Sequence, residues 1–172
     1  GVLNSTGIRG GKPYAPKSYE EFHLLPGISD ALFSLKNFDC LLIVVTNQPD
    51  VGNGIVEKEI VEKMHLKLLN ELPIDSLKVC YHKQTDGCKC RKPQPGMILE
   101  SASEFDIELN NSYMIGDRKS DIEAGIKAGC KTVFIEQGYA KNEQPEYVDI
   151  VANSLPDAVT KIIFQISGNQ TT

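Results

Sequence analysis

One stretch decides the fold of this chain: residues 112–135, which read SYMIGDRKSDIEAGIKAGCKTVFI. It begins with a short apolar run that is typical of a strand, and it turns at Gly116-Asp117. Residues 120–128 carry apolar side chains at helical spacing and are followed by a glycine, which favours helix ends. A second apolar run with β-branched residues follows at 131–135. This order predicts two parallel strands joined by a crossover helix.

The same alternation extends through the rest of the chain. Further strands are expected at 41–45, 77–81 and 148–151, and further helices at 28–37, 57–72, 95–105 and 153–166. The run at 41–45 is continuously apolar, the pattern of a strand buried on both faces, whereas 5–19 has no periodicity and predicts a loop. The fold class is therefore α/β: a three-layer Rossmann-like sandwich with a mainly parallel sheet, which binds ligands at the carboxyl ends of its strands.

Composition narrows the class of protein. A length of 172 residues suits one domain spanning 1–172. The net charge is −5 and no basic stripe is present, which argues against nucleic acid as the main partner. No apolar run approaches the roughly 20 residues of a membrane span. We expect a cytoplasmic protein, because most of its five cysteines fit a metal site better than disulfides, and we expect a monomer.

A metal site is predicted near mid-chain, in the loop 80–90. Four side chains with metal-ligand chemistry fall within it: Cys80, His82, Cys88 and Cys90. Three thiolates and one imidazole make a complete tetrahedral set for Zn²⁺ and leave no position for an activated water. The zinc is therefore expected to be structural. The alternative is a hairpin that carries unrelated thiols.

Polar groups follow the predicted strand at 41–45. Thr46, Asn47 and Gln48 are neutral donors suited to phosphate oxygens, although strand ends often carry polar turn residues.

Two carboxylates flank the start of the helix at 120–128. Asp117 lies at a strand end, where it can bind a hard cation such as Mg²⁺. Asp121 could orient the waters of that metal, or both acids could simply cap the helix.

Cations stand directly after the last predicted zinc ligand. Arg91 and Lys92 suit phosphate, since one offers a planar fork and the other a point charge, and the zinc loop would give them a rigid base. Donors, a lysine and a metal-binding aspartate at successive strand ends describe a site for phosphoryl transfer. No nucleophile or base completes it, because His23 and His65 are expected to be structural.

These segments resemble the haloacid dehalogenase superfamily of aspartate-dependent phosphatases, in particular its heptose bisphosphate and histidinol-phosphate phosphatase branch. The matching motifs are Thr46-Asn47-Gln48, Arg91-Lys92-Pro93 with the preceding zinc loop, and Gly116-Asp117 with the following helix start. The resemblance covers nearly the whole chain and implies a haloacid dehalogenase-like fold with a minimal cap.

The resemblance also implies roles. Thr46 and Lys92 would hold the reacting phosphoryl group. Asp117 would bind Mg²⁺, and Asp121 would orient the waters bound to that ion. Arg91 would contact the substrate beyond that phosphate, and Asn47, Gln48 and Arg118 would line the same pocket. The expected reaction removes the 7-phosphate from a heptose 1,7-bisphosphate, a step towards surface polysaccharides such as lipopolysaccharide. The short zinc loop together with the stretch 10–14 favours the α-anomer.

Two departures from the family pattern stand out. The motif that carries the aspartate nucleophile is matched only in its tail, by Gly1-Val2-Leu3-Asn4. We therefore expect the gene product to continue upstream of Gly1 with the first strand and both catalytic aspartates, and the chain as printed to be inactive. Gly52-Asn53-Gly54 stands where relatives carry Ala-Arg-Gly, which leaves substrate contacts in this loop open.

Three alternatives remain at this point. The enzyme could hydrolyse histidinol phosphate instead. The chain could be a non-catalytic phosphate-binding protein if the aspartate motif is absent. A zinc-ribbon nucleic-acid binder is the third, disfavoured by the acidic charge.

Overall fold

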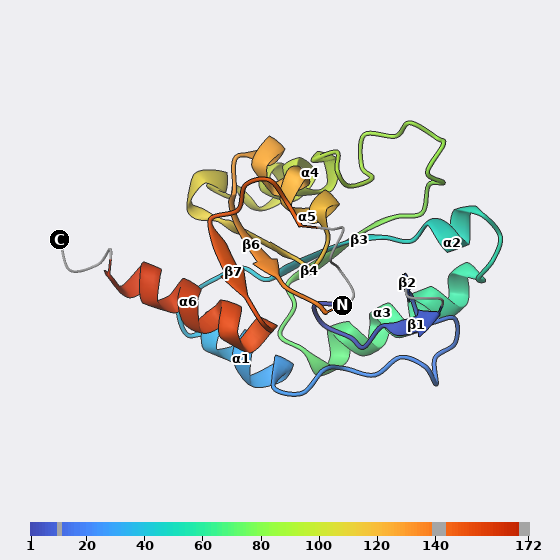
Figure 1. The fold of residues 1–172 in the computed structure, drawn as a ribbon, viewed down its shortest axis with the longest axis horizontal. Helices are drawn as coiled ribbons and strands as arrows, with labels where there is room; N and C mark the ends of the chain where they lie inside the picture. Colours follow the sequence, from blue (N-terminus) through green and yellow to red (C-terminus); the bar gives the residue numbers. More distant parts are fainter. Residues whose placement is uncertain (10–11, 139–143, 169–172) are drawn as a thin grey trace.

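The computed structural model describes residues 1–9, 12–138 and 144–168 (Figure 1). Its helices are α1 (Ile28–Lys36), α2 (Pro49–Gly52), α3 (Lys58–Glu71), α4 (Gly96–Phe105), the 3₁₀ turn η1 (Leu109–Asn111), α5 (Lys119–Ala128) and α6 (Leu155–Gly168). Its strands are β1 (Gly7–Arg9), β2 (Lys12–Tyr14), β3 (Ile43–Asn47), β4 (Ser76–Cys80), β5 (Tyr113–Gly116), β6 (Lys131–Ile135) and β7 (Ile150–Ala152).

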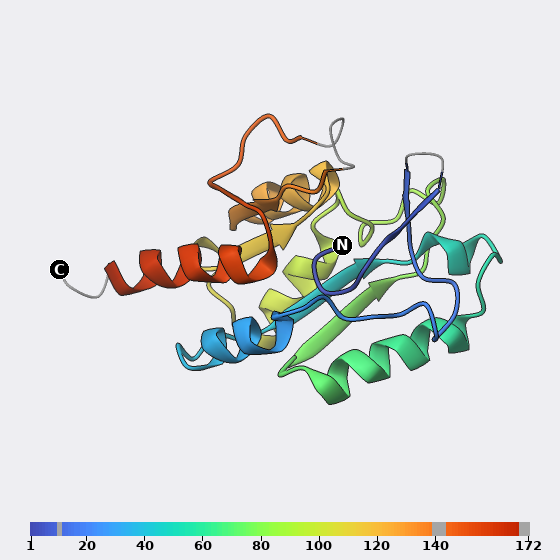
Figure 2. The same ribbon diagram turned by 60° about the horizontal axis from the view of Figure 1, so that its bottom comes forward.

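Five of the strands form parallel ladders, as the alternation of strands and helices predicts. β3 pairs with β4, and β5, β6 and β7 form a second ladder in that order. Figure 2 shows β3 and β4 running side by side above α3. The two ladders are not hydrogen-bonded to each other within the described residues.

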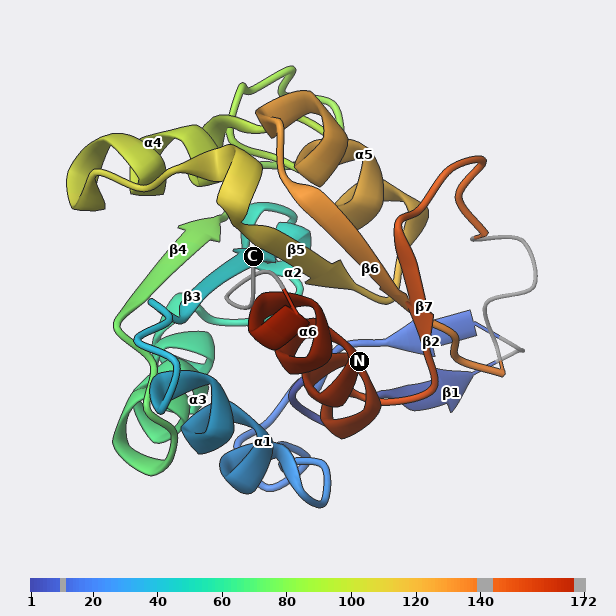
Figure 3. The same cartoon turned by 90° about the vertical axis from the view of Figure 1, so that its left-hand side faces the viewer.

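The helices cover the strands on both sides, which confirms the three-layer arrangement (Figure 3). On one side, the apolar faces of α1, α3 and α6 and residues of β6 and β7 form the larger core, which includes Leu32, Leu68, Val133 and Ile162. On the other side, α4 and α5 enclose a smaller core around Met114.

Local chemistry explains where the helices next to the strand ends begin and end. The backbone N–H of Arg118, the residue before α5, donates to the carboxylate of Asp121 at 3.1 Å, so one open donor of the helix start is satisfied. Gly129 ends α5 with φ 88°, a left-handed conformation that glycine adopts without strain. Asp121 therefore does cap its helix, as one of its two interpretations predicts.

One expectation about the N-terminal segment is wrong, and another lies partly outside the described residues. Residues 5–19 are not a plain loop, since they contain the short antiparallel hairpin β1–β2, whose strands are too short to show a period. Residues 10 and 11, part of the stretch used to favour the α-anomer, lie outside the described residues.

The strand predicted at 41–45 begins at Ile43 and extends to Asn47. Its residues are half-buried rather than buried on both faces, because β4 is its only strand partner in the described part of the chain. Among the described helices none has the length and apolar character needed to cross a membrane.

Candidate functional site

The site is built where β3 and β5 end. β3 ends with Thr46 and Asn47, and β5 ends at Gly116, directly before Asp117. Lys92, from the segment between β4 and α4, reaches both strand ends through the contacts described below. The predicted residues at the end of β3, the predicted residues after β5 and Lys92 therefore lie at one edge of the molecule.

The main chain of Lys92 is held by the side chain of Asn47. The Lys92 N–H donates to Asn47 Oδ1 at 3.1 Å, and Asn47 Nδ2 donates to the Lys92 carbonyl at 3.0 Å. The two residues are 45 positions apart in the chain, so this reciprocal pair depends on the tertiary fold.

The ammonium of Lys92 is fixed as well. It donates to the Val45 carbonyl at 2.7 Å and contacts Asp121 Oδ1 at 2.7 Å. The side chains of Lys92 and Asp121 are only 11% and 8% exposed, so water screens the pair little. Because an ammonium carries three protons, this geometry leaves one of them for an incoming anion.

Asp121 uses both carboxylate oxygens. One pairs with Lys92 and the other accepts the Arg118 N–H at the start of α5. Gly116 leaves room for this arrangement, because a Cβ at that position would lie 2.1 Å from the Asp121 Cβ. A glycine is thus required before Asp117 by close approach.

Asp117 is the carboxylate with the chemistry of a magnesium ligand. It is buried, with 6% of the residue exposed, at the end of β5. Its Oδ2 lies 3.2 Å from the backbone nitrogen of Gly1, so the first residue of the chain lies next to this carboxylate. A buried carboxylate oxygen at a strand end is a donor that suits a hard cation such as Mg²⁺.

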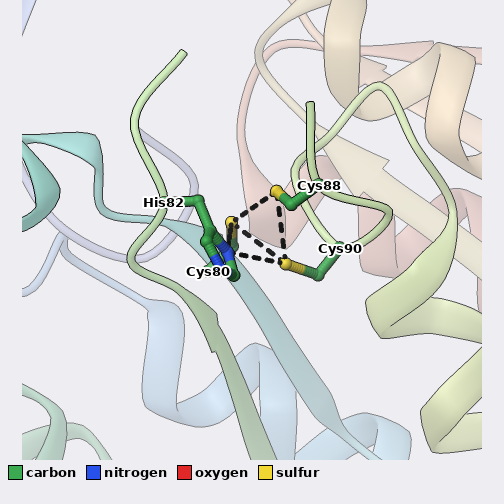
Figure 4. Close-up of side chains that lie close together, drawn as sticks. All are labelled: Cys80, His82, Cys88 and Cys90. Carbon is green, nitrogen blue, oxygen red and sulfur yellow. Dashed lines mark hydrogen bonds between the residues drawn. The ribbon is translucent and has the colours of Figure 1, made fainter. Parts of the chain in front are cut away.

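Cys80, His82, Cys88 and Cys90 converge as the spacing predicts (Figure 4). Cys90 Sγ lies 3.3 Å from Cys80 Sγ, 3.5 Å from Cys88 Sγ and 3.2 Å from His82 Nδ1. Bond lengths of about 2.3 Å to sulfur and 2.0 Å to nitrogen give a zinc tetrahedron edges of about 3.6–3.8 Å. The observed set is slightly tighter and fits the ion.

Electrostatics favour a cation at this cluster. Burial and the neighbouring thiols of Cys80 and Cys88 raise the pKa of Cys90 to about 12. Three thiolates this close together need a positive ion between them, and a divalent metal supplies it.

The zinc loop is attached to the end of β3 at several points. The Gln48 N–H donates to the Cys80 carbonyl at 2.7 Å, and Asn53 Nδ2 donates to Gln84 Oε1 at 3.2 Å. Gly52 packs so closely on this segment that a Cβ would lie 2.3 Å from the Tyr81 carbonyl. Metal cluster and strand end therefore form one connected region.

The remaining predicted residues are placed as follows. Thr46 Oγ1 accepts a hydrogen bond from Gln48 Nε2 at 3.2 Å. Arg91 has its Nη1 fully buried without a hydrogen-bond partner in the described part of the protein. Arg118 is exposed at the start of α5.

Both histidines outside the zinc loop lie elsewhere. His65 is buried on α3, where burial lowers its pKa, and His23 is exposed. The Val45 carbonyl is the site group that sequence reasoning missed, because a main-chain acceptor carries no residue signature. The role of Gly116 could have been predicted from the sequence, since a glycine between an apolar strand and an aspartate indicates that another group approaches the backbone closely.

Comparisons with known proteins show the family to which the chain is related. The family described as HAD-hydrolase-like matches residues 89–158, which include Lys92, Asp117 and Asp121. The chain is 32% identical over 152 residues to the D-glycero-beta-D-manno-heptose-1,7-bisphosphate 7-phosphatase of Photorhabdus laumondii, covering 80% of this chain and 81% of the relative.

Two further relatives are informative. The D-glycero-alpha-D-manno-heptose-1,7-bisphosphate 7-phosphatase of Campylobacter jejuni is 34% identical over 121 residues, covering 67% of this chain and 69% of the relative. The crystal structure of the D,D-heptose 1,7-bisphosphate phosphatase of B. bronchiseptica, complexed with magnesium and phosphate, is 26% identical. It superposes with a TM-score of 0.82 over 96% of this chain and 94% of that one.

Proposed function

The chain belongs to the haloacid dehalogenase-like hydrolases, and we propose that it is a phosphatase that removes the 7-phosphate from D-glycero-D-manno-heptose 1,7-bisphosphate. The observation that carries the proposal is the fixed ammonium of Lys92, 2.7 Å from both the Val45 carbonyl and Asp121, with Asp117 directly after β5. The names of the relatives support the choice of substrate.

In this proposal Lys92 and Thr46 bind the phosphoryl group that is transferred. Lys92 donates its third proton to a phosphate oxygen. The Thr46 hydroxyl accepts from Gln48, so its own proton is available for a second oxygen. Both donors are held in place before the substrate arrives, which suits a reaction that depends on positioning and charge neutralisation.

Arg91 is proposed to bind the substrate beyond that phosphate. Its buried Nη1 has no partner among the described residues, and a guanidinium nitrogen in that state is stabilised when an anionic group accepts from it. Gln48 and Arg118 are proposed to line the same pocket.

Asp117 would hold Mg²⁺, with Asp121 beside it. When bound, the ion would offset the negative charge on the phosphate. Asp117→Asn should abolish the dependence of activity on magnesium, whereas Asp157→Asn, a change of the same chemistry in the first turn of α6, should leave it intact. Magnesium-stimulated activity that persists in Asp117→Asn would place the metal elsewhere.

The zinc loop is proposed to be structural. Its four side chains fill a tetrahedral metal, and the last ligand is two residues before Lys92, so the ion would fix the segment that carries the lysine. We further propose one domain over 1–172 that acts as a monomer in the cytoplasm; the cysteines, none in a disulfide in the described structure, are in keeping with a reducing compartment.

The test is phosphate release by the full-length, zinc-loaded protein from three compounds: the α-anomer, the β-anomer and histidinol phosphate. We expect the heptose bisphosphates to be hydrolysed, with the α-anomer ahead. A much higher rate on histidinol phosphate would overturn the substrate assignment, and hydrolysis of none of the three would favour a protein that only binds phosphate.

A further inference from the structure

The end of β3 carries two neighbouring amides with different partners. Gln48 Nε2 donates to the side chain of Thr46, within its own turn. Asn47 instead directs both ends of its amide to the main chain of Lys92, at 3.1 Å and 3.0 Å. The Gln48 side chain therefore makes a local contact, whereas the Asn47 side chain makes a long-range one.

We propose that Asn47 is a positioning residue: it holds the backbone of Lys92 so that the ammonium is preset for phosphate, and it does not contact the substrate itself. This inference rests on the proposed function for the role of Lys92. It gives Asn47 a different task from Thr46, although the two are adjacent on one strand.

Geometry supports this task because Lys92 is held both at its main chain and at the ammonium end of its side chain. Asn47 fixes the N–H and the carbonyl, while the Val45 carbonyl and Asp121 fix the ammonium. A lysine otherwise loses much rotamer freedom when it binds an anion. Ordering it in advance lowers that cost at the moment of binding.

The end of β3 also contacts the zinc loop at both of its ends. The main-chain N–H of Gln48 donates to the Cys80 carbonyl, where the loop begins, and the Asn47 side chain binds the main chain of Lys92, just after the loop ends. The lysine is therefore positioned by two devices, the ligand set that ends at Cys90 and the amide of Asn47. Loss of Asn47 should free the lysine without releasing zinc.

The first test is hydrogen exchange of the Lys92 amide, measured by NMR on the full-length zinc-loaded protein. Asn47→Ala removes its acceptor and should accelerate exchange by about tenfold or more, whereas the matched control Gln48→Ala should leave it unchanged. Zinc content should equal that of the wild type in both. Unchanged exchange in Asn47→Ala, or loss of zinc from it, would overturn the proposal.

The second test is a double-mutant cycle in kcat/KM. Asn47→Ala should lower the value about tenfold, to the same extent for heptose bisphosphate and for a small aryl phosphate, because both present the phosphoryl group that Lys92 binds. In a Lys92→Ala background the same change should cost less than about twofold. The loss of kcat/KM caused by Gln48→Ala should be the same in the Lys92→Ala background as in the wild type.

Two results would contradict the inference. An equal loss with and without Lys92 would mean that Asn47 acts independently of the lysine. A loss confined to the heptose substrate would mean that Asn47 contacts the sugar. If Asn47→Ala does not fold, Asn47→Asp, which keeps the acceptor and removes only the donor, enters the same cycle. A wild type without turnover would defeat the proposed function, while the exchange experiment would still judge the placement by Asn47.

Discussion

Replacing Asp121 with asparagine tests the ion pair at the centre of the site. The aspartate accepts from two donors with two oxygens, the Lys92 ammonium at 2.7 Å and the Arg118 N–H at 3.1 Å. An amide has one oxygen, so the new side chain in Asp121→Asn must give up one of these contacts. If it keeps the helix contact, it turns an NH₂ group toward the lysine.

The cost follows from burial. The side chains of Lys92 and Asp121 are 11% and 8% exposed, which places the pair in the class where removing one charge leaves the other poorly solvated. Such changes cost about 3–5 kcal/mol. Because the amide retains one good contact and the Val45 carbonyl still binds the ammonium, we expect about 3 kcal/mol for Asp121→Asn.

Urea unfolding of the zinc-loaded protein measures this loss as a shift in midpoint at constant slope. The double variant Lys92→Met/Asp121→Asn is the control, since it removes the stranded cation and should regain part of the stability. A loss below about 1 kcal/mol for Asp121→Asn would refute the reasoning, because that is the value expected of an exposed pair.

Three further predictions address other parts of the molecule. Cys88→Ser should lower the zinc content measured by atomic absorption and reduce the Tm by about 2–4 °C for each kcal/mol lost; full zinc retention with unchanged melting would contradict the cluster. Gly116→Ala should cost about 1–3 kcal/mol and weaken binding of inorganic phosphate, because its Cβ would lie 2.1 Å from the Asp121 Cβ; calorimetry checks both, and unaltered stability would mean that α5 shifts freely. His65 has its pKa lowered from 6.5 by burial, so the unfolded state binds its proton first and stability should fall as the pH drops below about 6.5. In His65→Gln this part of the pH dependence of the unfolding free energy should disappear, and equal pH slopes in the two proteins between pH 7 and 5 would rule it out.

Regular elements with a strong local pattern could be predicted from the sequence. The strand at 131–135 has the predicted bounds. The bounds of α5 differ from the prediction only in that the helix begins one residue earlier, because its capping acid and the glycine at its end are local signals. The hairpin β1–β2 was not predicted, since each strand has three residues and no period. Half-burial of β3 was not predicted either, because it depends on which strands flank it.

By itself the sequence determined the alternation of strands and helices and the metal cluster, because the ligands of that cluster lie within one short loop and their chemistry identifies the ion class. The tertiary structure alone decided how Lys92 is held. Its partners are the amide of Asn47 and a main-chain oxygen of Val45, 45 and 47 positions away. Neither contact has a signature in residue type or spacing, since hydrogen bonds between segments this far apart in the chain form only when the fold brings the segments together.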